Sequence, residues 1–253
     1  MRQDERAPFV QALQRARRAA YPSGEFVDQE SFMLASEVLT LARAAGVAPG
    51  VSVLDLCCGV AGPGRHIARE LGCDYLGVDY SASAIEIARE RARDLPCRFD
   101  VGRVPPLPAG PFDVVLLLET MLAFPDKVPL LREVSRALGP GGRFALTFEE
   151  GQPLTAQERA AMPDADTVWL TPLTEMVQLL ADVGLRVSWQ QECTHAHRTM
   201  ADSLLRAYAS EGDEIAACVG GRALDELLAA HRLWRDWLGA GRVRKFALVA
   251  EKV

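Results

Sequence analysis

The sequence has few lysines and no excess of positive charge. Only Lys127, Lys245 and Lys252 are lysines among 28 basic residues, and 34 acidic residues give a formal net charge of −6. Binding to the phosphate backbone of a nucleic acid requires a basic face. The composition therefore argues against DNA or RNA as the main partner.

Long apolar runs and paired cysteines are also missing. No stretch approaches the roughly 18 apolar residues that a membrane span needs, and residues 1–6 are too polar for a signal peptide. The six cysteines form no Cys-x-x-Cys pair, so neither a metal site nor a disulfide framework is predicted. We expect free thiols in a cytoplasmic protein that has no membrane partner.

The 253 residues alternate between apolar strands and helices. Strands are predicted over 51–56, 75–78, 97–101, 112–118, 143–148, 185–192 and 244–251. Helices are predicted over 5–20, 30–45, 63–71, 82–94, 126–138, 172–183, 199–210 and 222–238. Such alternation indicates βαβ units and an α/β fold, a doubly wound sheet with helices on both faces.

We expect three parts in this fold: a helical arm over 1–45, a core over 46–194 and 243–253, and a helical insert over 195–242. Ligands of open α/β sheets bind at the carboxyl ends of the strands. The loops after the first four strands are therefore the place to look for a site.

Two carboxylates follow the first two strands in a pattern that suits an aminoacyl nucleoside. Asp55 stands in a glycine-rich turn, residues 53–64, where it would repel a pyrophosphate but could hold an amine. Asp79 ends the next strand 24 residues later, where it can accept hydrogen bonds from a ribose. An amine, a ribose and no phosphate describe S-adenosylmethionine, and Asp55 makes a nicotinamide dehydrogenase a distant alternative.

The chain resembles the class I S-adenosylmethionine-dependent methyltransferases, in particular those of small molecules such as sarcosine, sterols and natural products. The resemblance extends over about residues 50–150. It lies in the turn at 53–64, in Gly-Val-Asp-Tyr-Ser at 77–81, in Phe-Asp-Val-Val at 112–115 and in the Leu-to-Pro-Gly-Gly segment at 131–142. It implies a single Rossmann-like sheet of seven strands with the last strand antiparallel.

The resemblance also implies a set of site residues. The cofactor S-adenosyl-L-methionine, which becomes S-adenosyl-L-homocysteine, would contact Tyr21, Gln29, Asp55, Cys57, Gly59, Asp79, Tyr80, Gly102, Arg103, Val104 and Glu119. Two departures stand out: Cys57 and Ala61 replace glycines of the turn, and Arg103 replaces an aspartate that accepts from adenine. The adenine contact would then come from Asp100 or from the backbone.

A general base is needed only where the acceptor atom carries a proton that must leave. The segment 119–127 resembles a loop of sterol methyltransferases, but Ala123 stands where that family has histidine. Candidate catalytic residues are therefore Glu119, which could instead cap a helix, and His195 and His197, which could instead be exposed loop residues.

The predicted substrate is a small molecule, on the grounds of an acidic composition and of an apolar, tryptophan-bearing insert that could close over it. We expect a secondary metabolite methylated at nitrogen or oxygen. Glu149 and Glu150 could bind an amine substrate or could lie on a solvated face. Two alternatives are methylation at carbon and cofactor binding without transfer. The sequence does not predict the oligomeric state.

Overall fold

A computed structural model describes residues 11–253 of the chain, so residues 5–10 of the predicted helix 5–20 lie outside the described residues. A single seven-stranded sheet organises this part, in the order β3-β2-β1-β4-β5-β7-β6. The strands are β1 (Ser52–Leu56), β2 (Asp74–Asp79), β3 (Cys97–Val101), β4 (Phe112–Leu117), β5 (Leu138–Glu150), β6 (Leu185–Glu192) and β7 (Arg244–Lys252). β7 is antiparallel to both of its neighbours, whereas the first five strands are parallel. The predicted fold class is confirmed.

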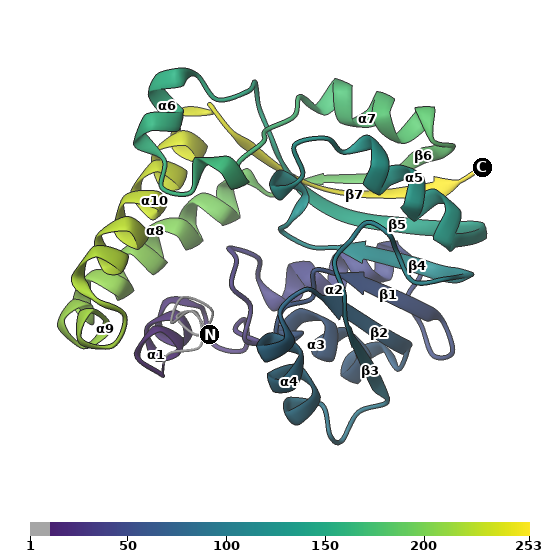
Figure 1. Cartoon of the computed structure of the whole chain (residues 1–253), viewed down its shortest axis with the longest axis horizontal. Coiled ribbons are helices and arrows are strands. Elements are labelled where there is room, and N and C mark those ends of the chain that lie inside the picture. Colours follow the sequence, from purple (N-terminus) through teal and green to yellow (C-terminus); the bar gives the residue numbers. More distant parts are fainter. Residues whose placement is uncertain (1–10) are drawn as a thin grey trace.

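Helices cover both faces of the sheet (Figure 1). The α-helices of residues 11–253, not all of which lie on the sheet, are α1 (Gln11–Ala20), α2 (Ala35–Ala44), α3 (Gly62–Leu71), α4 (Ala82–Arg91), α5 (Val128–Ala137), α6 (Ala156–Ala161), α7 (Leu173–Asp182), α8 (Thr194–Ser210), α9 (Gly212–Val219) and α10 (Gly221–Ala240). One apolar core joins the sheet to α2, α3 and α4, and a second joins the opposite face to α5 and α7. Alternate residues of β1, such as Val53 and Leu54, belong to the two different cores, which explains why the strand is apolar throughout.

The helices between β6 and β7 stand beside the sheet and away from its two faces. Figure 1 shows α8, α9 and α10 together with α1 at the side where the parallel strands end. These helices share a third apolar core that includes Leu13, Met200, Tyr208 and Ile215. None of the helices in residues 11–253 is long and apolar enough to cross a membrane.

Several elements differ from the sequence prediction: α2 begins at Ala35 and not at residue 30, and β5 begins at Leu138 and not at residue 143. Helix α8 begins at Thr194 and not at residue 199, and the Thr194 hydroxyl accepts a 3.0 Å hydrogen bond from the Lys245 amide of β7. Helix α6 was not predicted, although Thr155 and Glu158 form the capping box that marks its start. Helix α9 was not predicted either; it is short, eight residues, and its buried Ile215 belongs to the apolar core that α1, α8 and α10 share.

Candidate active site

Two adjoining cavities lie at the carboxyl ends of the parallel strands. The first, of about 210 Å³, lies between the turn after β1 and the arm segment 28–33, and we call it the turn cavity. The second, of about 220 Å³, is lined by residues of the arm, α8 and α10, and we call it the helical cavity. Glu30, Ser31 and Glu119 line both, so the cavities meet at these three residues.

Asp55 is a buried carboxylate in the wall of the turn cavity. The Tyr75 hydroxyl donates a 2.5 Å hydrogen bond to its Oδ2. Tyr75 fits there because Gly64 has no side chain: a Cβ on Gly64 would lie 2.0 Å from the Tyr75 hydroxyl oxygen. Burial raises the pKa of Asp55 to about 7, although the bond from Tyr75 acts in the opposite direction. A cation bound in the cavity would therefore be well placed to stabilise the ionised form.

Asp79 fixes the shape of the glycine-rich turn. Its Oδ2 accepts from the Gly59 amide at 2.9 Å, and its Oδ1 accepts from the Ser81 amide at 2.8 Å. Each carboxylate oxygen keeps a further lone pair, so these bonds leave capacity for hydroxyl donors of a ligand. Cys57 and Gly59 line the turn cavity, and Cys57 has a φ of 57° that is uncommon for a residue with a side chain.

The arm segment covers the turn cavity because it packs directly on α3. A Cβ at Gly62 would lie 2.1 Å from the Val27 carbonyl oxygen, so only glycine permits this approach. Asp28 then pairs with Arg65 at 2.9 Å and with Arg91 at 3.1 Å. Gly62 thus serves the contact between arm and core.

The two arm residues predicted to contact a cofactor have bonds within the arm. Gln29 lines the turn cavity, but its amide donates to the carbonyls of Glu25 and Met33 at 2.7 and 2.8 Å. The Tyr21 hydroxyl donates to the Ser31 carbonyl oxygen. These bonds hold the arm in place over the cavity.

The other residues predicted to contact the cofactor lie at or just beyond the ends of β2 and β3. The Gly102 amide donates to the Asp79 carbonyl at 2.9 Å, and the Arg103 guanidinium lies 5.4 Å from the centre of the Tyr80 ring. Tyr80 is 63% exposed. Tyr80, Gly102, Arg103 and Val104 are not among the residues that line the turn cavity, so their contacts with a cofactor stay predictions.

Glu119 stands where the two cavities meet and has a strained backbone. Its φ is 60°, and such outliers often occur at functional sites. Thr147 of β5 holds it on two sides: the Thr147 hydroxyl oxygen accepts from the Glu119 amide at 2.7 Å and lies 2.8 Å from Glu119 Oε1. Burial raises the pKa of Glu119, but the opposing effects of Lys245 and His197 prevail and leave this pKa below its ordinary value.

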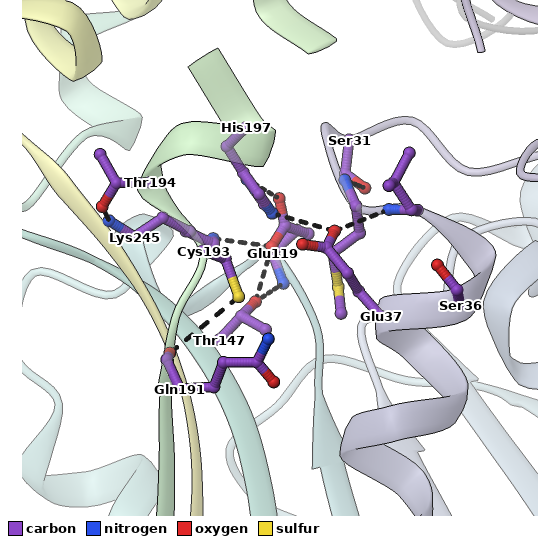
Figure 2. A network of polar contacts seen from close by, with 12 residues as sticks. Ser31, Ser36, Glu37, Glu119, Thr147, Gln191, Cys193, Thr194, His197 and Lys245 are labelled. Atoms are coloured by element: carbon purple, nitrogen blue, oxygen red, sulfur yellow. Dashed lines mark hydrogen bonds and ion pairs between the residues drawn. The ribbon is translucent and has the colours of Figure 1, made fainter. Parts of the chain in front are cut away.

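Lys245 completes the site, and the sequence analysis did not identify it. It is buried at the start of β7, and its Nζ lies 2.7 Å from Glu119 Oε1 (Figure 2). The same Nζ lies 2.6 Å from Glu149 Oε1. Burial alone would lower the pKa of Lys245, but Glu119 and Glu149 more than offset it and raise this pKa. One ammonium therefore bridges two carboxylates, Glu119 in the loop after β4 and Glu149 in β5.

The two predicted histidines differ in their surroundings. His197 is buried in the first turn of α8, with Nε2 3.6 Å from Glu37 Oε2 and Nδ1 3.9 Å from Glu119 Oε2 (Figure 2). His195 is exposed and lines neither cavity. Both belong to a helix and not to the loop that the sequence analysis expected. The structure brings only His197 to Glu119.

The helical cavity combines apolar walls with charged groups. Phe32, Leu122, Leu204, Trp234 and Leu238 supply apolar surface. Among residues 11–253 there is no group of three or more metal-ligating side chains placed to hold a metal ion.

Comparisons with known proteins identify the core. A family model described as "Methyltransferase domain" matches residues 48–198. Methyltransferase GfsG of Streptomyces halstedii is 38% identical over 106 residues, covering 40% of this chain and 38% of that protein. Ajmaline N-methyltransferase of Rauvolfia serpentina is 26% identical over 169 residues, covering 59% and 58%. The chain thus spans less than two thirds of the length of either relative.

A solved structure with the same fold is phosphoethanolamine N-methyltransferase 2 of Haemonchus contortus in complex with S-adenosyl-L-methionine. Its TM-score is 0.78 at 19% sequence identity, and the match covers 94% of this chain and 56% of that one. At this identity the likeness concerns the fold alone.

Proposed function

Because the chain belongs to the methyltransferase domain family, we propose that it transfers a methyl group from S-adenosyl-L-methionine to nitrogen or oxygen of a small organic molecule, a secondary metabolite. The turn cavity would hold the donor and the helical cavity the acceptor. The observation that carries this proposal is that both cavities open on the same three residues, Glu30, Ser31 and Glu119. Methyl transfer needs donor and acceptor to meet in line, and adjoining cavities provide that meeting point.

The residues of the turn cavity fit the proposed cofactor. Asp55 suits its ammonium group, since a cation would favour the ionised form of a carboxylate that burial disfavours. Asp79 does not line the turn cavity itself, but it bonds to the Gly59 amide of the turn and has spare acceptor capacity for the ribose hydroxyls. A Cβ at Gly59 would meet nothing within 4 Å, so its backbone borders open space that a ligand can enter. When bound, the cofactor supplies an electrophilic methyl group on a sulfonium, which an acceptor lone pair displaces with the bonding pair passing to sulfur.

The chain's own contribution would be to orient the acceptor, exclude water and remove a proton. His197 is the proposed general base, since it is buried next to Glu119 and has Glu37 at its other ring nitrogen to orient the ring. Helices α8 and α10 belong to the insert, residues 195–242, and would act as a lid that covers the site. The core, residues 46–194 and 243–253, would lie beneath this lid, and the arm, residues 1–45, beside it. The apolar side chains of the helical cavity suit an organic acceptor.

The test is a transfer assay with methyl-labelled S-adenosyl-L-methionine and a panel of small amines, phenols and alcohols. We expect labelled product and S-adenosyl-L-homocysteine in equal amounts from members of the panel. Asp79→Ala should weaken donor binding, while Asp74→Ala, at the exposed far end of the same strand, should not. Donor binding without any S-adenosyl-L-homocysteine, or a label carried only on carbon, would contradict the proposal.

A further inference from the structure

Carboxylates outnumber cations in the described wall of the helical cavity. Glu30, Glu119 and Glu149 face Arg17 and Lys245. Arg17 pairs with Glu30 at 2.9 Å, and Lys245 is shared between the other two carboxylates. The wall therefore holds one negative charge that these two cations do not balance.

Protonation of His197 would not change the sign of this balance. The other nitrogen of its ring lies beside a further carboxylate, Glu37, at 3.6 Å. A charged His197 would offset Glu37, and a neutral His197 would leave a second carboxylate without a cation. In both states an anionic ligand is disfavoured in this cavity and a cationic one is favoured.

Glu149 is the carboxylate with unused bonding capacity. Its Oε1 accepts from Lys245, whereas its buried Oε2 has no hydrogen-bond partner among the described residues. A buried acceptor without a donor is unfavourable, and such atoms are rare in folded proteins. The terminal torsion of a glutamate is soft, so a small rotation can turn this oxygen toward a donor in the cavity that Glu149 lines.

His231 adds a second acceptor to the same cavity. Its Nδ1 lies 2.8 Å from the Leu227 carbonyl oxygen, so this nitrogen carries the ring proton and donates. Burial lowers the pKa of His231 to about 4, and the ring is neutral at physiological pH. Its Nε2 consequently has a free lone pair and no proton to offer.

Aromatic rings form part of the wall near these acceptors. The Phe32 ring lies edge-on to His231 at 5.6 Å and to His197 at 6.2 Å, and Tyr208 lies edge-on to His231 at 5.0 Å. Trp234 lines the cavity beside them. Aromatic faces attract organic ammonium ions and also bury their apolar substituents.

We infer that the helical cavity selects an acceptor that carries a protonated amine on an apolar body, with Glu149 as the anchor for the ammonium group. This inference rests on the proposed function for the use of the cavity as the acceptor site. Glu149 and Glu119 bond to one and the same ammonium of Lys245. The anchor therefore lies next to the residue at which the two cavities meet.

The experiment is calorimetric binding to the protein saturated with S-adenosyl-L-homocysteine. The probes are matched sets of an amine, an alcohol and a carboxylic acid, each built on an indolylethyl, a phenylethyl and an n-octyl body. In at least one set we expect the amine to bind about tenfold or more tightly than the alcohol, and the acid to bind most weakly. Equal affinity for amine and alcohol in every set, tighter binding of the acids, or no binding by any amine would overturn the inference.

A pair of variants tests the anchor itself. Glu149→Gln should remove the preference for the amine and leave alcohol binding within about twofold. Glu150→Gln is the matched control, since Glu150 is the next residue of β5, pairs with Arg244 at 2.8 Å and does not line the cavity. Equal behaviour of the two variants would contradict the role of Glu149. If Glu149→Gln does not fold, the ligand series on the unmodified protein decides.

Binding and transfer are read separately, so the two proposals can fail independently. Glu149-dependent amine binding without S-adenosyl-L-homocysteine formation from S-adenosyl-L-methionine would refute methyl transfer and support the amine site. Methylation of alcohols with no preference for amines would support methyl transfer and refute the amine site.

Discussion

Removal of the Lys245 charge should destabilise the fold strongly. The buried Nζ lies 2.7 Å from Glu119 and 2.6 Å from Glu149, so Lys245→Met leaves two carboxylates in the same apolar surroundings with no cation between them. Removal of one partner from a buried ion pair typically costs about 3–5 kcal/mol. Methionine keeps the length of the side chain, which limits any contribution from a cavity. We expect the free energy of unfolding to fall by about 3–5 kcal/mol at pH 8.

The loss should depend on pH in a defined direction. In the native protein the pKa of Glu119 is below its ordinary value, so this residue contributes stability above its unfolded pKa and loses it as the pH falls through the folded one. In Lys245→Met, the effect of Lys245 no longer opposes burial at Glu119, so the pKa of Glu119 should rise above its unfolded value. The folded variant then binds protons more readily than the unfolded chain, so its stability should rise as the pH falls. The deficit relative to the unmodified protein should therefore shrink from pH 8 to pH 5.

Urea unfolding followed by tryptophan fluorescence at pH 5, 6.5 and 8 measures this difference. The control is Arg244→Met, the preceding residue of β7, whose half-exposed guanidinium pairs with Glu150 at 2.8 Å. An exposed pair contributes about 1 kcal/mol or less. This view of the buried network is refuted if Lys245→Met lowers the free energy of unfolding at pH 8 by no more than Arg244→Met does. It is also refuted if the difference in this free energy between Lys245→Met and the unmodified protein grows from pH 8 to pH 5.

Three further predictions concern the two cavities. Asp79→Ala should weaken S-adenosyl-L-homocysteine binding by about 1–3 kcal/mol in calorimetry, through lost bonds to a charged group, and an effect no larger than that of Asp74→Ala would contradict it. His197→Gln should lower kcat by about 10²–10⁴-fold with unchanged S-adenosyl-L-homocysteine affinity, whereas the exposed His195→Gln should leave both unchanged; equal rates in the two variants would exclude His197 as the base. The rise in Tm caused by S-adenosyl-L-homocysteine should be larger at pH 8 than at pH 6, because Asp55 ionises with a pKa of about 7, and Asp55→Asn should remove this difference; a pH-independent rise in the unmodified protein would speak against the Asp55 contact.

The fold could be predicted because its signals are local in the sequence. Each strand and its following helix have their own periodicity, and the turn that carries Asp55 lies within one βα unit. The same holds for Asp79 at the end of the next strand. The start of α8 was missed because its first turn is fixed by the bond between Thr194 and the Lys245 amide, two residues 51 positions apart.

The centre of the site was predicted only in part for the same reason. Glu119, Glu149 and His197 were candidates as single residues, but nothing in the sequence placed them around one cation. Lys245 is the group that joins them, and it lies 126 positions from Glu119. A signal was present nonetheless: a lysine rarely lies within an apolar strand unless it is paired, and this chain has only three lysines.

The arm shows a different limit of sequence reasoning. Gln29 was predicted to contact the cofactor, and that contact stays a prediction, but the sequence did not show that the Gln29 amide also bonds to two carbonyls of the arm backbone. A sequence pattern does not distinguish a residue that touches a ligand from one that shapes the loop around it. The distinction depends on which backbone carbonyls lie within reach, and only the folded chain provides that information.

The most direct test of the account is calorimetric titration of the protein with S-adenosyl-L-homocysteine and, separately, with NAD⁺. The arrangement of Asp55 and Asp79 around the turn predicts one binding site per chain for the aminoacyl nucleoside and no heat from the dinucleotide. Binding of NAD⁺, or no binding of S-adenosyl-L-homocysteine at millimolar concentration, would contradict it.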